Sequence, residues 1–182
     1  MYRYIYILSL LFISMLGYTQ PVPNVDENIP YLMTFGPQAE TSWGDDDFSQ
    51  AFFFLIPDEY TQPFFIRVFD PDIGGEIDEI AGDWNTRSTF EVFGGEMTWS
   101  EADARETRPQ GNYKSGTLLA SRAFADNPRY DNGWYAFGPF NPAQGEHVEM
   151  FGGHVFKLIC EGVTGDDGNM YRYYLSTDAD NN

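Results

Sequence analysis

Carboxylate side chains are the residues whose spacing points to chemistry in this sequence, and they gather in three short, glycine-containing loops. Carboxylates held on neighbouring loops repel one another, and a cation bound between them relieves that repulsion. Calcium suits such loops because it accepts about six to eight oxygen ligands in a tolerant geometry. We therefore predict a calcium site from three groups of residues: Asp45, Asp46 and Asp47; Asp70, Asp72, Glu76, Asp78 and Asp83; and Asp166 and Asp167.

The second loop has the most informative spacing. Asp70 and Asp72 follow an apolar run and lie two residues apart, so in an extended segment both side chains project to the same side. Gly74 and Gly75 then permit a sharp turn. The loop is not an EF-hand, because Gly74 and Ala81 stand where that motif needs its ligand at position five and its final glutamate.

The segment 66–72, which reads Ile-Arg-Val-Phe-Asp-Pro-Asp, resembles the step from strand to loop in C2-type domains. Those domains are calcium-binding β-sandwiches, and the chain is also similar to secreted bacterial β-sandwich modules of the cell envelope. The resemblance implies Asp70 and Asp72 as calcium ligands. It does not extend to binding of phospholipids, because Lys114 and Lys157 are the only lysines and no basic surface is available.

The composition of the chain excludes some classes of binding partner. The net charge is −18, which argues against nucleic acid and against an anionic membrane surface, since both need a basic face. Aromatic residues make up 18% of the chain, whereas disordered acidic chains are poor in them. The acidic loops therefore belong to a folded protein, either as cation sites or as a solvated edge that aids solubility.

Short runs of β-branched and aromatic residues, separated by Gly, Pro, Asn and Asp, predict strands throughout. The predicted strands are Tyr31–Phe35, Ser49–Ile56, Phe64–Phe69, Ser88–Phe93, Thr117–Phe124, Trp134–Phe140, His154–Glu161 and Met170–Ser176, with His147–Met150 as a candidate ninth. Eight or nine short strands predict an all-β fold, an antiparallel β-sandwich of jelly-roll or C2-like type. The polar stretch 98–108 is compatible with a short helix or a long loop.

The N-terminus has the pattern of an export signal. Arg3 is followed by an apolar run from Ile5 to Leu16, and Gly17-Tyr18-Thr19 provides small residues for cleavage. We expect a signal peptide at 1–19 and a single domain at 20–182, with an uncleaved signal anchor as the alternative. The polar end of the chain, 177–182, is either a frayed tail or the lead into further sequence of a longer protein.

Tryptophan side chains provide a candidate ligand rim. Trp43, Trp84, Trp99 and Trp134 could stack on sugar rings, and the first two lie in or beside the acidic loops. A carbohydrate-binding module would require two exposed, co-planar rings among them. For most other rings a core position is the default.

Catalytic signals are weak. The chain has two histidines, His147 and His154, and no G-x-S-x-G sequence. Cys160 lies on the same face of an alternating run as Phe156, which predicts a core residue. A zinc site formed by His147, His154 and Cys160 would lack a standard ligand spacing. A carboxylate pair of the glycoside hydrolase type stays open, because 28 acids always provide some suitable pair.

Two arginines in predicted strands, Arg67 and Arg172, are expected to form structural ion pairs with the abundant carboxylates. Taken together, the sequence predicts a secreted, non-catalytic binding or structural module located in the periplasm or at the cell surface. Its partner would be a protein or a glycan.

Overall fold

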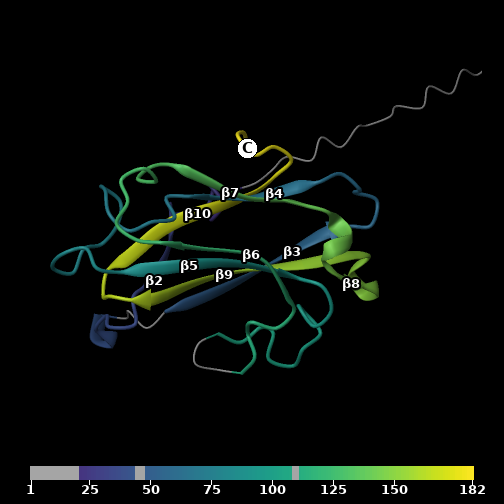
Figure 1. Cartoon of the computed structure of the whole chain (residues 1–182), viewed down its shortest axis with the longest axis horizontal. Coiled ribbons are helices and arrows are strands. Elements are labelled where there is room, and N and C mark those ends of the chain that lie inside the picture. The colour runs from purple at the N-terminus through teal and green to yellow at the C-terminus, as the bar shows by residue number, and fades with distance from the viewer. Residues whose placement is uncertain (1–20, 44–47, 108–110) are drawn as a thin grey trace, which may run out of the picture.

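The computed structural model describes residues 21–43, 48–107 and 111–182, and this part of the chain is almost entirely β-structure. Two antiparallel sheets pack against each other, which confirms the predicted all-β sandwich (Figure 1). Ten strands are present in the described residues: β1 (Pro21–Val22), β2 (Leu32–Phe35), β3 (Ser49–Pro57), β4 (Phe64–Phe69), β5 (Arg87–Gly94), β6 (Thr117–Phe124), β7 (Trp134–Phe140), β8 (Glu146–Val148), β9 (Gly153–Thr164) and β10 (Gly168–Ser176).

Each sheet is built around one long central strand. The β10 sheet has the order β1-β10-β4-β7, and β2 also pairs with β10. The β9 sheet has the order β3-β9-β5-β6, and β8 also pairs with β9. Three short 3-10 helices lie in the connections: η1 (Thr41–Trp43), η2 (Pro142–Gln144) and η3 (Glu149–Phe151). The β9–β10 turn joins the two sheets, so both central strands reach the same end of the sandwich (Figure 1).

The sequence signals locate most strands to within two or three residues, because aromatic and β-branched runs coincide with strands here. The additional strand is β1, whose two residues are too few to show any alternation. The candidate strand from His147 to Met150 ends at Val148 and passes into η3. The stretch 98–107 consists of turns and irregular segments, and residue 108 lies outside the described part of the chain.

Aromatic rings fill the space between the sheets. Phe64, Val68 and Tyr171 of the β10 sheet meet Phe90 and Phe156 of the β9 sheet, and all five are buried. Phe64 packs edge-on against Phe156, and Phe90 packs edge-on against Tyr171. Such contacts between rings add to the stability that burial of apolar area already provides. Cys160 is fully buried in the same cluster, which confirms that it is a core residue.

Strand β9 is buried on both faces, although its alternation suggested one core face. Lys157 points away from the core, yet it is 0% exposed because the connection from β5 to β6 covers it. Its Nζ donates hydrogen bonds to the carbonyl oxygens of Ala104 and Tyr113 and to Ser115 Oγ. Burial of the ammonium lowers the pKa of Lys157 to about 8. This side chain therefore fastens an irregular segment to the sheet.

Substitution of Lys157 should detach that segment. We expect Lys157→Ala to lower the free energy of unfolding by about 3 kcal/mol, because it removes three hydrogen bonds and leaves a cavity beneath the loop. Chemical denaturation measures the change. The matched control is Arg87→Ala, which removes an exposed basic side chain of the same sheet and should cost at most about 1 kcal/mol. Equal effects of the two substitutions would contradict this role for Lys157.

Candidate metal centre

The pairing of β4 with β7 brings two acidic loops together at one end of the sandwich. Phe69, the last residue of β4, pairs with Trp134, the first residue of β7. Asp70 therefore follows β4 at the point where Asp131 precedes β7, and the Asp70 amide donates a hydrogen bond to the Gly133 carbonyl at 2.8 Å. Asp70 has a φ of 55°, which turns the chain sharply out of the strand.

Three carboxylates meet in this corner. Asp70, Asp72 and Asp131 each place one oxygen so that the three oxygens lie within 4.8 Å of one another. Asp70 is 1% exposed, Asp72 is 0% exposed and Asp131 is partly exposed. Two full negative charges at that distance repel by at least about 3 kcal/mol at an effective dielectric constant of 20. We refer to these three residues as the aspartate triad.

The buried oxygens of the triad lack hydrogen-bond partners among the described residues. Both carboxylate oxygens of Asp72 and Oδ1 of Asp70 are unpaired. Buried polar atoms almost always find a partner, and an unpaired buried carboxylate costs several kcal/mol. The arrangement therefore has unused ligand atoms that point into a negatively charged corner.

Burial is the main cause of the raised pKa values of Asp70 and Asp72. It raises the pKa of Asp70 to about 6 and that of Asp72 to about 7, and the charge of Asp131 adds to both shifts. Nearby backbone amides, that of Asn132 at Asp70 and those of Asp72 itself and Asn127 at Asp72, oppose the shifts without outweighing burial, and none forms a regular hydrogen bond to the unpaired oxygens. In the metal-free protein, these two carboxyls therefore ionise at a higher pH than an ordinary aspartate does.

Gly74 and Asp126 lie next to the triad, near the partly exposed Asp131. A Cβ on Gly74 would lie 3.5 Å from Oδ1 of Asp126 and 3.6 Å from Oδ1 of Asp131, so both carboxylates flank this glycine. Gly74 has a φ of 131°, a conformation that other residues rarely adopt. The exposed Asp126 lies beside Ile73 through a parallel bridge. Asp126 thus lies beside the triad, although it is not one of the three carboxylates that meet there.

Asp78, which the sequence also suggested as a ligand, is used differently. Its two oxygens accept hydrogen bonds from the backbone amides of Gly74 and Met170. Burial raises the pKa of Asp78 to about 8, and the charges of Asp70 and Asp72 contribute. Asp78 therefore connects the loop after β4 to strand β10 and helps to fix the position of the loop that carries Asp70 and Asp72. Glu76 and Asp83, in the same loop, are exposed and do not join the triad.

In the third predicted group, Asp166 and Asp167, the carboxylate of Asp167 also binds backbone amides instead of remaining free. Asp167 is 0% exposed and accepts hydrogen bonds at 2.9 Å from the amides of Ala81, Asn85 and Thr86. These bonds lower its pKa despite burial. Asp167 therefore holds the loop after β4 against the β9–β10 turn. The two loops meet as expected, but hydrogen bonds rather than a shared set of free carboxylates join them.

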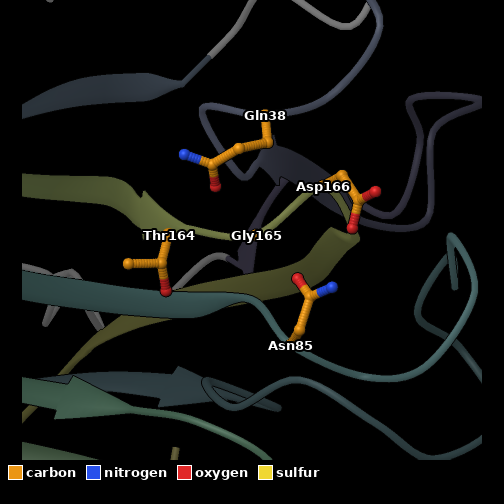
Figure 2. Close-up of a pocket in the computed structure, with 5 residues that line it drawn as sticks. All are labelled: Gln38, Asn85, Thr164, Gly165 and Asp166. Carbon is orange, nitrogen blue, oxygen red and sulfur yellow. The ribbon is translucent and has the colours of Figure 1, made fainter.

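Asp166, the neighbour of Asp167, faces an open hollow of about 420 Å³. Figure 2 shows the amide side chains of Gln38 and Asn85 around this hollow, together with Thr164 and Gly165. The predicted ligands Asp45, Asp46 and Asp47 lie outside the described residues. Among the described residues, the aspartate triad is therefore the candidate metal centre, and Asp126 lies beside it.

The tryptophans proposed as a ligand rim are dispersed. Trp99 packs edge-on against Phe53 of β3, in the β9 sheet, and against Phe151 of η3. Trp134 packs against Phe69 and Tyr174 on the β10 sheet. Trp84 is half-buried in the loop after β4, and the side chain of Trp43 lies outside what the structure describes. Among the described residues, no ring contact joins two tryptophans.

Sequence reasoning missed Asp131 and Asp126. Both lie in the segment Asp126-Asn127-Pro128-Arg129-Tyr130-Asp131-Asn132-Gly133, whose acids are five residues apart and do not form a run. The turn-forming residues between two predicted strands were a usable signal. The deciding fact is the β4–β7 pairing, which places this segment beside Asp70.

Comparison of the chain with protein-family models, with curated proteins and with solved structures finds no match.

The pKa shifts predict how pH acts on the metal-free protein. Asp70, Asp72 and Asp78 have folded-state pKa values raised above the unfolded value, so their ionisation opposes folding as pH rises from about 4 to 8. Asp167, whose pKa is lowered, is already fully ionised at the start of this range, so its contribution to stability stays constant across it. Ionisation of Lys157 changes the stability only above about pH 8. We expect the melting temperature in chelator to fall between pH 4.5 and 8.

Asp72→Asn should flatten that fall, because the amide carries no charge in either state. Thermal unfolding followed by circular dichroism at several pH values gives the measurement, and Asp83→Asn, an exposed acid of the same loop, is the matched control. A melting temperature in chelator that rises over this range would contradict the buried-carboxylate account.

Proposed function

We propose that this chain is an exported, non-catalytic binding or structural module of the cell envelope whose loops are ordered by calcium at the aspartate triad. The observation that carries the proposal is the set of buried, unpaired oxygens on Asp70 and Asp72, within 4.8 Å of an oxygen of Asp131. The apolar run at 5–16 supports export. No helix in the described part of the chain is long and apolar enough to cross a membrane.

Calcium fits the triad better than other common ions. All donors are carboxylate oxygens, which calcium and magnesium prefer over the imidazole and thiolate ligands of transition metals. The ligands come from irregular loops rather than from a regular octahedral frame, and calcium tolerates such geometry. Asp126 and water can complete the coordination on the open side. An ion bound there neutralises the repulsion and ties the 70–86 loop to the 125–133 loop.

A binding role fits the position of the triad better than catalysis does. Asp70 and Asp72 have the raised pKa typical of a catalytic acid, but they are only 1% and 0% exposed. A polymeric substrate cannot contact them, whereas a small ion can reach them past the partly exposed Asp131. The calcium-ordered loops would instead present their outer surface to a protein or a glycan.

Calcium should raise the thermal stability of the protein. Saturation at a hundredfold excess over Kd contributes about 2.7 kcal/mol, which corresponds to about 5–10 °C for a domain of this size. We expect Asp72→Asn to abolish the calcium-dependent rise while raising the melting temperature in chelator at pH 8, because it removes a buried charge. Differential scanning calorimetry with calcium and with chelator measures both effects.

Two variants serve as controls for the calcium experiment. Asp83→Asn should keep the full calcium-dependent rise, because this side chain is exposed and lies outside the triad. Asp167→Asn should lower the melting temperature by a similar amount with and without calcium, because it weakens hydrogen bonds to three amides. An unchanged melting temperature of the wild-type protein on addition of calcium would overturn the proposal.

A carbohydrate-binding role is the second candidate, and a different surface favours it. The outer face of the β10 sheet has a strip of half-buried rings with two arginines stacked on them, which we call the aromatic face. Tyr31 stacks on Phe69 with an interplanar angle of 16°, and Arg172 lies 4.7 Å above Phe69. Arg67 lies 4.6 Å above the ring of Trp134. Flat rings and guanidinium groups of this kind are suited to an acidic glycan.

The two arginines do not form the ion pairs expected from the sequence. No carboxylate of the described residues lies within ion-pair distance of Arg67 or Arg172, and the Nε atom of each is buried without a hydrogen-bond partner. Arg67 donates instead to Oδ1 of Asn182, and the charges of Asp178 and Asp180 oppose the lowering of its pKa by burial. The polar end of the chain therefore folds back onto the aromatic face.

Binding to an acidic glycan should depend on Trp134. We expect titration with polygalacturonate to quench tryptophan fluorescence, and Trp134→Ala to weaken the interaction by up to about tenfold, since one ring contact contributes about 0.5–1.5 kcal/mol. Trp99→Ala, on the other sheet, is the matched control. Equal binding by the two variants would exclude the aromatic face as the site.

A further inference from the structure

The only two histidines of the chain lie opposite each other on neighbouring strands, far from the aspartate triad along the sandwich. His147 of β8 pairs directly with His154 of β9. Residues opposite each other in an antiparallel pair have side chains close enough to share one ligand. The two imidazole rings have centroids 5.1 Å apart. The chain thus places both of its imidazoles at one point on the surface.

Asp58 adds a third ligand atom from the next strand. It follows β3, whose residue Ile56 pairs with His154, and its amide donates to the Gly152 carbonyl. Oδ1 of Asp58 lies 3.3 Å from Nε2 of His147 and 3.8 Å from Nε2 of His154. Three adjacent segments of the β9 sheet therefore contribute one donor each, in the order His147, His154, Asp58.

We propose that His147, His154 and Asp58 form a binding site for a transition-metal dication, with zinc as the expected ion. Zinc prefers imidazole and carboxylate ligands at about 2.0–2.2 Å, which places two ligands of a tetrahedral site about 3.4 Å apart. The two Nε2–Oδ1 distances are close to that value. Unlike the donor atoms of the triad, these three do not all lie within 4.8 Å of one another, so zinc binding requires rotation of the His147 side chain, which is 45% exposed.

The side chains of Asp58, His147 and His154 are exposed enough for a bound metal ion to keep one coordination position open to solvent. The side chains of Asp58 and His147 are 50% and 45% exposed, and that of His154 is 23% exposed. Nδ1 of His154 is buried without a hydrogen-bond partner among the described residues. A histidine ligand usually donates from its second nitrogen, and loss of such a bond weakens metal binding by about 10–100-fold. Zinc therefore binds here reversibly rather than as a permanent structural ion.

The zinc site is chemically distinct from the aspartate triad. The triad offers only carboxylate oxygens and lies at the ends of β4 and β7, whereas the histidines lie where β8 pairs with the start of β9. Carboxylate sites favour calcium, and imidazole sites favour zinc. Each site can therefore be tested with the other blocked.

The test is a zinc titration of the untagged protein in saturating calcium, followed by isothermal titration calorimetry. A polyhistidine tag is removed beforehand because it binds zinc. We expect one zinc ion per chain, at least tenfold weaker binding in His147→Ala and in Asp58→Asn, and unchanged binding in Asp72→Asn. With Co²⁺ in place of zinc, visible absorption that appears in the wild type and is lost in His147→Ala reports imidazole ligation.

Three results would overturn the proposal: no saturable zinc binding by the wild type, equal binding by His147→Ala, or loss of binding in Asp72→Asn. The last result would assign the zinc to the aspartate triad. Because His147 is largely exposed, His147→Ala is expected to fold, and circular dichroism checks that it does. Failure of zinc binding leaves calcium binding unaffected, so the two proposals are tested separately.

Discussion

Burial of mutually repelling carboxylates is the constraint on which the loop end of this sandwich depends. Asp70 and Asp72 have almost no exposed surface, and their free oxygens lie close to one of Asp131. Proteins are stable by about 5–15 kcal/mol, so an uncompensated cluster of this kind would consume a large share of that stability. The cluster must either hold protons or hold a cation. The proposed calcium ion is the second solution, and it is the one that works at neutral pH.

The surrounding loops are arranged to hold the carboxylates in this position without neutralising them. Asp167 and Asp78 use their own carboxylates to bind backbone amides of the loop after β4 and of β10. The Asp70 amide binds the Gly133 carbonyl, which fixes the two loops to each other. Acidic residues therefore have two separate roles here: some build the loops through hydrogen bonds, and the triad is left with unused oxygens. Composition alone does not separate these roles.

Local sequence patterns predicted the strands well because each strand is itself a run of aromatic and β-branched residues. They predicted the site only in part. Asp70 and Asp72 were identified from their spacing after a strand, a local feature. Asp131 was missed because its proximity to Asp70 results from the pairing of β4 with β7, which no local pattern encodes. The same limit applies to Asp58, which reaches the histidines only through the β3–β9 pairing.

Calcium binding coupled to proton release tests the central claim most directly. Isothermal titration with calcium at pH 6.5, in two buffers of different ionisation enthalpy, counts the protons released as the ion binds. The account predicts one saturable site that releases about one proton, because burial keeps Asp72 largely protonated at this pH. The absence of a saturable site, or calcium binding without proton release, would contradict it.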